Sequence, residues 1–172
     1  PIMVNGVLYA SNGVGLVEAL DPETGRALWV QKPDAGPLGP GASNRGVAHW
    51  APEPGGAAGR SAGDDAARIL TYRNQYLYAL DPKTGAPIQS FGANGRVDLN
   101  AGLGPLAGTY RWNSAPLVVR DVVVMGSAMV DQDSASKMEG EPGDVRAFDV
   151  RTGRLRWIWR VIPRAGEAGV ES

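Results

Sequence analysis

The sequence predicts an all-β chain, a β-propeller fragment of about three four-stranded antiparallel blades. Three observations support this prediction: a motif that occurs three times, short strand candidates before each copy, and a turn-rich composition. The 172 residues include 24 Gly, 13 Pro and 5 Trp, a balance that favours many short strands over long helices. No segment shows a convincing helical period beyond one or two turns.

The repeated motif has the form Asp-x-x-Thr-Gly. Its copies begin at Asp21, Asp81 and Asp149. The pattern is typical of a tight β-turn. The Asp side chain can accept hydrogen bonds from the backbone N–H groups two or three residues later, and Gly can adopt the positive φ that the turn requires. Trp29 and Trp157 lie four residues after that Gly, where a large ring can cover the joint to a neighbouring sheet. The second copy has Gln89 in this position, so we expect one blade to lack this ring.

Strand candidates lie upstream of each copy and are separated by turn residues. They are 1–4 and Val7–Ser11 around Asn5-Gly6, then Gly46–Trp50, Arg68–Tyr72 and Gln75–Leu80, then Leu117–Val119 and Val122–Gly126. Four short strands in each tandem unit are typical of propellers. The approximate blades are 1–40, 41–100 and 101–172. The stretches 51–67, 92–110 and 131–143 are predicted to be irregular, the first as a surface excursion.

Three blades do not close a ring, because propellers need about four to eight. We therefore expect a fragment whose remaining blades belong to a longer protein. The chain begins at Pro1 with neither an initiator Met nor a basic-then-apolar leader, which also suggests sequence from the middle of a protein.

Composition excludes several classes of function. The formal net charge is −1 and like charges do not cluster, so we expect no nucleic-acid partner. The absence of Cys excludes zinc-finger, iron–sulfur and thiol chemistry and any disulfide framework. No stretch approaches the roughly 18 apolar residues that span a bilayer.

With the Asp-x-x-Thr-Gly-x-x-x-Trp turn, the chain resembles the pyrroloquinoline quinone (PQQ)-dependent dehydrogenases. These are eight-bladed propellers that hold PQQ and calcium, or another divalent metal, on the central axis. The turn resembles their tryptophan-docking motif. The likeness extends to Asn-Arg-Gly-Val-Ala-His-Trp at 44–50, to the segments 126–131 and 143–149, and to the tail 161–167.

The branch within this family stays open. Residues 91–99, Phe-Gly-x-x-Gly-x-Val-Asp-Leu, resemble the glucose and polyol dehydrogenases. The alcohol dehydrogenases typically carry a vicinal Cys pair shortly before Asn-Arg-Gly, where this chain has Gly-Pro-Gly at 39–41. Gly41 also stands where the glucose branch usually has a His.

The resemblance implies a cofactor site made of Arg45, Asn113 and Ser114, and a metal ligand at Asp131. Arg45 would hold a cofactor carboxylate or quinone oxygen, because a guanidinium makes charged, bidentate contacts. Asn113 stands where relatives often have a Thr that binds a cofactor carboxylate. Asp131 would supply a hard oxygen ligand. From the residues alone, Arg45 could equally be a solvated surface cation and Asp131 a loop cap, with Asp133 an equal candidate.

The chain is expected to contain no catalytic base. His49, the only histidine, ends an apolar strand, and packing explains it better than base catalysis. The Asp residues of the three motifs have a structural role. In the family the base is an Asp of a later blade, so the 172 residues alone should not turn over substrate.

The implied activity is oxidation of an alcohol, polyol or aldose hydroxyl by hydride transfer to the quinone. Electrons would pass to ubiquinone or cytochrome c. The family implies a periplasmic location, with any attachment to the inner membrane made by a segment outside this chain. The alternative is a non-catalytic propeller of the same repeat family, such as an outer-membrane assembly or interaction scaffold. The Asn-Arg-Gly strand and the acidic loop after Gly126-Ser127 count against that alternative.

Overall fold

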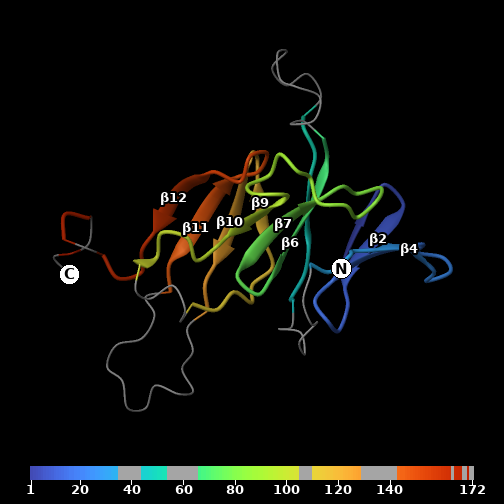
Figure 1. Ribbon diagram of the computed structural model, residues 1–172, viewed down its shortest axis with the longest axis horizontal. Helices are drawn as coiled ribbons and strands as arrows, with labels where there is room; N and C mark the ends of the chain where they lie inside the picture. Colours follow the sequence, from blue (N-terminus) through green and yellow to red (C-terminus); the bar gives the residue numbers. More distant parts are fainter. Residues whose placement is uncertain are drawn as a thin grey trace.

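Three four-stranded antiparallel sheets make up the computed structural model (Figure 1). It describes residues 1–34, 44–53, 66–104, 110–128, 143–163, 165–167 and 170. Figure 1 shows the sheets following one another in chain order, from blue through green to orange and red. In these ranges every regular element is a strand, which confirms the predicted all-β class.

In each sheet the spatial order of the strands is their chain order. The first sheet contains β1 (Ile2–Val4), β2 (Val7–Ser11), β3 (Val17–Leu20) and β4 (Ala27–Val30). The second contains β5 (Ala48–Trp50), β6 (Arg68–Arg73), β7 (Tyr76–Leu80) and β8 (Arg96–Asp98). The third contains β9 (Leu117–Val119), β10 (Val122–Gly126), β11 (Val145–Asp149) and β12 (Leu155–Trp159). β1 contacts β5 and β5 contacts β9, so the first strands are the inner strands, as in a propeller.

The predicted hairpins form with small changes of boundary. Val4 pairs with Val7 across Asn5 and Gly6, both at positive φ, and β9 and β10 have the predicted bounds. In the second sheet the turn residues are Asn74 and Gln75, with Asn74 at a φ of 54°. The sequence analysis placed this turn one residue earlier. It also predicted that the strand ending at Trp50 begins at Gly46, two residues before the observed start at Ala48.

The three Asp-x-x-Thr-Gly turns have the predicted geometry. Oδ1 of each Asp accepts the backbone N–H groups two and three residues on, at 2.7–3.1 Å. The three glycines have φ of 69°, 71° and 72°. We call these turns the corners; their residues are Asp21–Gly25, Asp81–Gly85 and Asp149–Gly153.

The second blade differs from the prediction after its corner. Only an isolated bridge, Leu80 to Pro87, follows the corner, because proline has no N–H to continue a strand ladder. The fourth strand is instead β8, which pairs with β7. The stretch 92–110, predicted to be irregular, therefore contains a strand.

Trp29 covers the joint between the first and second sheets, as predicted. Its Nε1 donates to the carbonyl of Pro82 at 2.9 Å, and its ring lies over Gly85 of the second corner. Trp157 is 45% exposed, since the described residues form no fourth sheet that could cover it.

At the joint between the second and third sheets, Phe91 and Val97 replace the missing tryptophan. A Cβ added to Gly153 would lie 2.4 Å from Val97 Cγ2 and 3.4 Å from the Phe91 ring. Gly92 also donates its N–H to the carbonyl of Thr152 at 2.9 Å. The expected absence of a ring at Gln89 is confirmed, and side chains a few residues later fill the space.

The hydrophobic core lies between the sheets in two clusters. One joins the first and second sheets and includes Tyr9, Val17, Ile69 and Leu80. The other joins the second and third sheets and includes Trp50, Leu70, Phe91, Trp112, Met125 and Phe148. The blades are therefore held together by burial of their faces, the main favourable contribution to folding.

Candidate cofactor-binding site

The antiparallel sheets have two ends, and the predicted site residues gather at one of them. The leading face is the end at which the inner strands β1, β5 and β9 begin; the corner face, opposite, carries the three corners. Arg45 precedes β5, and Asn113 and Ser114 precede β9, so all three lie at the leading face. Only the tertiary arrangement shows that these segments, far apart in sequence, share one end of the molecule.

Asn44 fixes the backbone that carries Arg45. Its Nδ2 donates to Thr71 Oγ1 at 2.6 Å and to the carbonyl of Tyr72 at 2.8 Å. Its Oδ1 accepts the N–H of Gly46 at 3.1 Å, and its carbonyl accepts from Ser11 Oγ at 3.0 Å. The sequence analysis assigned no role to this side chain, although an Asn directly before Arg-Gly is a recognisable turn signal.

Arg45 is exposed and presents a free cation at the leading face. Within the described ranges its guanidinium has no hydrogen-bond or ion-pair partner, while its backbone N–H donates to the Tyr72 hydroxyl at 3.4 Å. Burial raises the pKa of Tyr72, and the N–H and positive charge of Arg45 partly oppose that rise. Tyr72 therefore stays a neutral phenol close to Arg45, and the sequence analysis missed it.

Gly46 allows the second and third blades to approach closely beside Arg45. Its φ is 153°, a conformation that favours glycine. A Cβ built on it would lie 3.2 Å from the Cβ of Ala115. Ala115 directly follows Asn113 and Ser114, so this contact brings the start of β5 and the approach to β9 together.

Asn113 has a polar atom without a partner. Its Oδ1 is buried and accepts no hydrogen bond from any described residue, which is uncommon because buried polar atoms are normally paired. Ser114 is exposed at the same place. Among the described residues, the Asn113 Oδ1 and the Arg45 guanidinium have no protein partner, and both could contact a polar ligand.

Asp131 lies outside the described residues, as does most of the stretch 131–143. The chain leading to it is described as far as Ala128, whose N–H donates to the carbonyl of Arg111 at 2.7 Å. At the same end Ser127 donates its N–H and its Oγ to the carbonyl of Asp144, at 3.2 and 3.0 Å. The segment before Asn113 therefore runs beside the end of β10, at the leading face.

The described residues fit a flat polyanion such as PQQ. The Arg45 guanidinium can donate charged, bidentate hydrogen bonds to a carboxylate or quinone oxygen. The amide of Asn113, turned about its last torsion, places an NH₂ donor where the unpaired Oδ1 now lies. For a metal the described ranges supply no cluster of three or more Asp, Glu, His or Cys side chains. A metal would therefore depend on residues outside the described ranges, where Asp131 and Asp133 lie.

His49 is the middle residue of β5 and, unlike Arg45, lies toward the second corner, near Asp81 and Lys83. It is half-buried, and burial lowers the pKa of its imidazole below the usual value. The expectation of a packed or half-exposed histidine is confirmed, and the fold separates it from the leading face. In the ranges described, no helix is long and apolar enough to cross a membrane.

Comparison with known proteins identifies one family. Residues 1–172 match the PQQ family model described as glucose/ethanol/alcohol dehydrogenase, beta-propeller domain. The chain is 31% identical over 168 residues to quinoprotein glucose dehydrogenase of Gluconobacter oxydans (strain 621H), covering 92% of this chain and 20% of that protein. It is 32% identical over 174 residues to quinate/shikimate dehydrogenase (quinone) of Acinetobacter baylyi (strain ATCC 33305 / BD413 / ADP1), covering 92% and 21%.

Solved structures show the same fold. Quinohemoprotein alcohol dehydrogenase from Comamonas testosteroni matches with a TM-score of 0.64 at 24% identity, over 95% of this chain and 21% of that one. Quinohemoprotein alcohol dehydrogenase ADHIIG from Pseudomonas putida HK5 matches with a TM-score of 0.61 at 26% identity, over 95% and 20%. The chain spans about a fifth of the length of the relatives that it matches.

Proposed function

Since the chain belongs to the PQQ-dependent glucose/ethanol/alcohol dehydrogenase β-propeller family, we propose that the protein containing it oxidises a hydroxyl group of an alcohol, polyol or aldose. PQQ would accept the hydride. The observation that carries this proposal is that, at the leading face, Arg45 and the buried oxygen of Asn113 both lack a partner among the described residues. A propeller that serves only as a scaffold needs neither feature.

Arg45 would orient the cofactor. An Arg fork can grip a carboxylate or quinone oxygen through two parallel N–H groups and stays charged at any pH that the protein tolerates. Asn44 holds the backbone of Arg45 through three side-chain hydrogen bonds. Little conformational entropy of the backbone is then lost on binding, which is the benefit of preorganisation.

Asn113 and Ser114 would hold a second edge of the same cofactor. The close contact between Gly46 and Ala115 would set their distance from Arg45, because the Gly46 backbone packs against the Ala115 methyl group. Asp131 would provide a carboxylate ligand for calcium, or for another divalent metal, next to the cofactor. When bound, the quinone supplies the hydride-accepting carbon and the metal polarises it as a Lewis acid.

No residue of this chain is proposed as the catalytic base. The motif carboxylates of Asp21, Asp81 and Asp149 accept backbone N–H groups inside the corners, on the face away from Arg45. A base would come from another part of the longer protein, with ubiquinone or cytochrome c as electron acceptor. A periplasmic location, with or without attachment to the inner membrane, is part of the same proposal.

The test uses the full-length protein with PQQ and calcium. Dye reduction is measured with a panel of alcohols, polyols and aldoses, and quinone affinity is measured separately by titration. Arg45→Ala should weaken quinone binding about 30-fold, since a hydrogen-bonded charge pair contributes about 2 kcal/mol. Arg26→Ala, at the exposed residue directly after the first corner, is the matched control and should bind normally.

Two results would overturn the proposal. A wild-type protein that binds no quinone favours the scaffold function. If Arg45→Ala binds quinone as tightly as the wild type does, Arg45 is not part of the cofactor site, even if the protein oxidises alcohols.

A further inference from the structure

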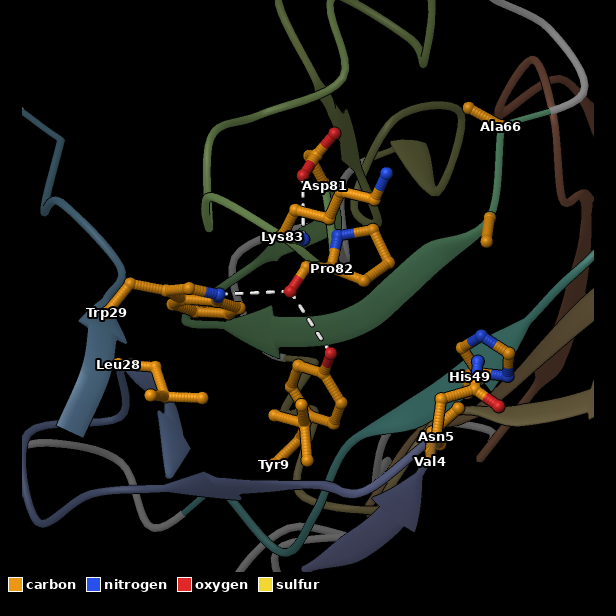
Figure 2. A pocket seen from close by; sticks show the side chains of 12 residues that line it. Val4, Asn5, Tyr9, Leu28, Trp29, His49, Ala66, Asp81, Pro82 and Lys83 are labelled. Atoms are coloured by element: carbon orange, nitrogen blue, oxygen red, sulfur yellow. Dashed lines mark hydrogen bonds between the residues drawn. The ribbon is translucent and has the colours of Figure 1, made fainter. Parts of the chain in front are cut away.

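A cleft of about 640 Å³ lies between the first and second blades, toward the corner face. Tyr9, Trp29 and Pro82 form one side of it, and His49 faces them across the gap (Figure 2). Val4, Val7 and Lys83 also line it. The proposed cofactor site at the leading face does not use this space, whereas the second corner lines it through Asp81, Pro82 and Lys83.

The repeat allows the cleft to be compared with the next joint. Val122 pairs directly with the corner residue Asp149 in the third sheet. By the same register, since Leu8 pairs with Leu20 and Ile69 with Leu80, the equivalent position is Val7 in the first sheet and Arg68 in the second. The inner-strand partner of Val7 is Val4, and that of Arg68 is Trp50.

At the joint between the second and third blades the equivalent space is filled. The Arg68 guanidinium lies 5.1 Å from the centre of the Trp50 ring. It donates to the carbonyls of Val150 at 3.1 Å and Arg151 at 2.8 Å. The Arg151 guanidinium lies 4.5 Å from the same ring. One flat ring and two guanidinium groups thus close this joint.

At the first joint the same scaffold lacks those groups. Two valines replace Trp50 and Arg68, and Lys83 stands where the third corner has Arg151. The carbonyl of Pro82 is already bonded, to Trp29 Nε1 at 2.9 Å and to the Tyr9 hydroxyl at 3.1 Å. In the described ranges the ammonium of Lys83 has no acidic partner and its carbonyl accepts no hydrogen bond.

We propose that this cleft binds a planar aromatic molecule of about indole size that carries an N–H donor. The ring would occupy the place of the Trp50 ring, between the apolar surface of Val4 and Val7 and the Lys83 ammonium, a cation–π contact. The N–H would donate to the carbonyl of Lys83, as Arg68 does to that of Arg151. The volume is within the usual range of ligand sites, about 300–1,000 Å³.

Charge favours a neutral ring over a guanidinium compound as the ligand. Lys83 and Asp81 both line the cleft, so their opposite charges offset one another and the cleft has no net charge that would attract an ionic ligand. His49 adds no further positive charge near neutral pH, because burial lowers the pKa of its imidazole and favours the neutral form. The cleft therefore fits an uncharged aromatic donor.

The test is calorimetric titration of the full-length protein, saturated with PQQ and calcium, using indole as the probe. Indole should bind saturably, and 1-methylindole, which lacks the N–H donor, should bind at least about fivefold more weakly. The Val4→Trp/Val7→Arg double variant copies the filled joint and should abolish binding. Lys83→Met should weaken binding about threefold, while Lys32→Met, at an exposed lysine, should not.

Absence of saturable indole binding, or equal binding by 1-methylindole, would overturn the inference. If the double variant does not fold, as shown by the loss of a cooperative unfolding transition, the comparison of Lys83→Met with Lys32→Met tests the indole site instead. Because the readout is binding and not turnover, the experiment stands apart from the proposed function. An enzyme with no indole site and an indole-binding protein with no dehydrogenase activity would give different results.

Discussion

The indole ring of Trp29 lies directly against Gly85 of the next blade. A Cβ added to Gly85 would come within 2.5 Å of Trp29 Cε3, which is far inside van der Waals contact. The corner glycine therefore has two roles: it adopts a φ of 71°, and it leaves room for the ring that joins two blades.

Gly85→Ala should destabilise the protein by about 2–4 kcal/mol, because backbone strain and a clash with a packed ring combine. Gly6→Ala is the control: its φ is 78° and no heavy atom lies within 4 Å of an added Cβ, so only the strain of about 1 kcal/mol applies. Denaturant titration of both variants measures the difference. Equal losses would show that the Trp29 contact does not restrain Gly85.

Trp29 and Tyr9 share one acceptor, the carbonyl of Pro82. Tyr9→Phe should destabilise by about 1 kcal/mol, because the carbonyl keeps one donor. In a Trp29→Phe background the same change should be larger, since the carbonyl is then left without a protein donor. A double-mutant cycle in urea tests this coupling. Strict additivity would mean that water replaces both donors without loss.

Asp149 should link stability to pH. Burial alone raises its pKa, but hydrogen bonds from Thr152 and Arg156 outweigh burial and lower the pKa below the ordinary value. Its contribution is therefore present at neutral pH and is lost as the pH falls from the ordinary pKa of about 4 toward the lowered one. Asp149→Asn should destabilise by about 2 kcal/mol at pH 7 and by less at pH 3.

The measurement for Asp149 is unfolding free energy at a series of pH values. Asp21→Asn is the matched control, because Asp21 has the same place in the first corner but is more exposed. It should show a smaller loss at pH 7. A loss for Asp149→Asn that stays constant from pH 7 to pH 3 would contradict the prediction.

Asn113 should contribute to PQQ binding but little to the stability of the cofactor-free protein. Its buried Oδ1 has no partner, so Asn113→Ala should leave the cofactor-free protein within about 1 kcal/mol of wild type or make it more stable. The same variant should bind PQQ about tenfold more weakly, because a donor to a charged group is lost. Thermal unfolding and quinone titration check the two halves. A clear loss of stability with unchanged quinone affinity would indicate a purely structural role.

The corners, the hairpins of the first and third sheets, and the all-β class were predictable from sequence because they depend on local chemistry. Asp, Thr and Gly make their hydrogen bonds and unusual φ angles within a few residues, and alternating strands of defined length need no distant partner to be recognised. β8 was missed for a related reason. Pro87 interrupts the ladder that follows the other corners, and no local signal shows that the chain pairs again at Arg96.

The candidate site was only partly predictable. Arg45, Asn113 and Ser114 were named from resemblance, but the reason that they lie near one another is the contact of Gly46 with Ala115, between segments about 70 residues apart. Asn44 before Arg-Gly is a local turn signal, but its hydrogen-bond partners Thr71 and Tyr72 and the unpaired oxygen of Asn113 could not be predicted from residue type. Both depend on which atoms of other strands lie within hydrogen-bond reach.

The sequence by itself determined the repeat, the corner chemistry and the family, because these reside in short runs of residues. Only the tertiary structure decided which ring covers which glycine, that Phe91 and Val97 replace a missing tryptophan, and that a cleft lies between the first two blades near the corner face. The physical reason is that packing between sheets depends on the volumes of side chains from distant segments. A pair of valines at one joint and a Trp–Arg pair at the next occupy equivalent positions, and only the first leaves the space open.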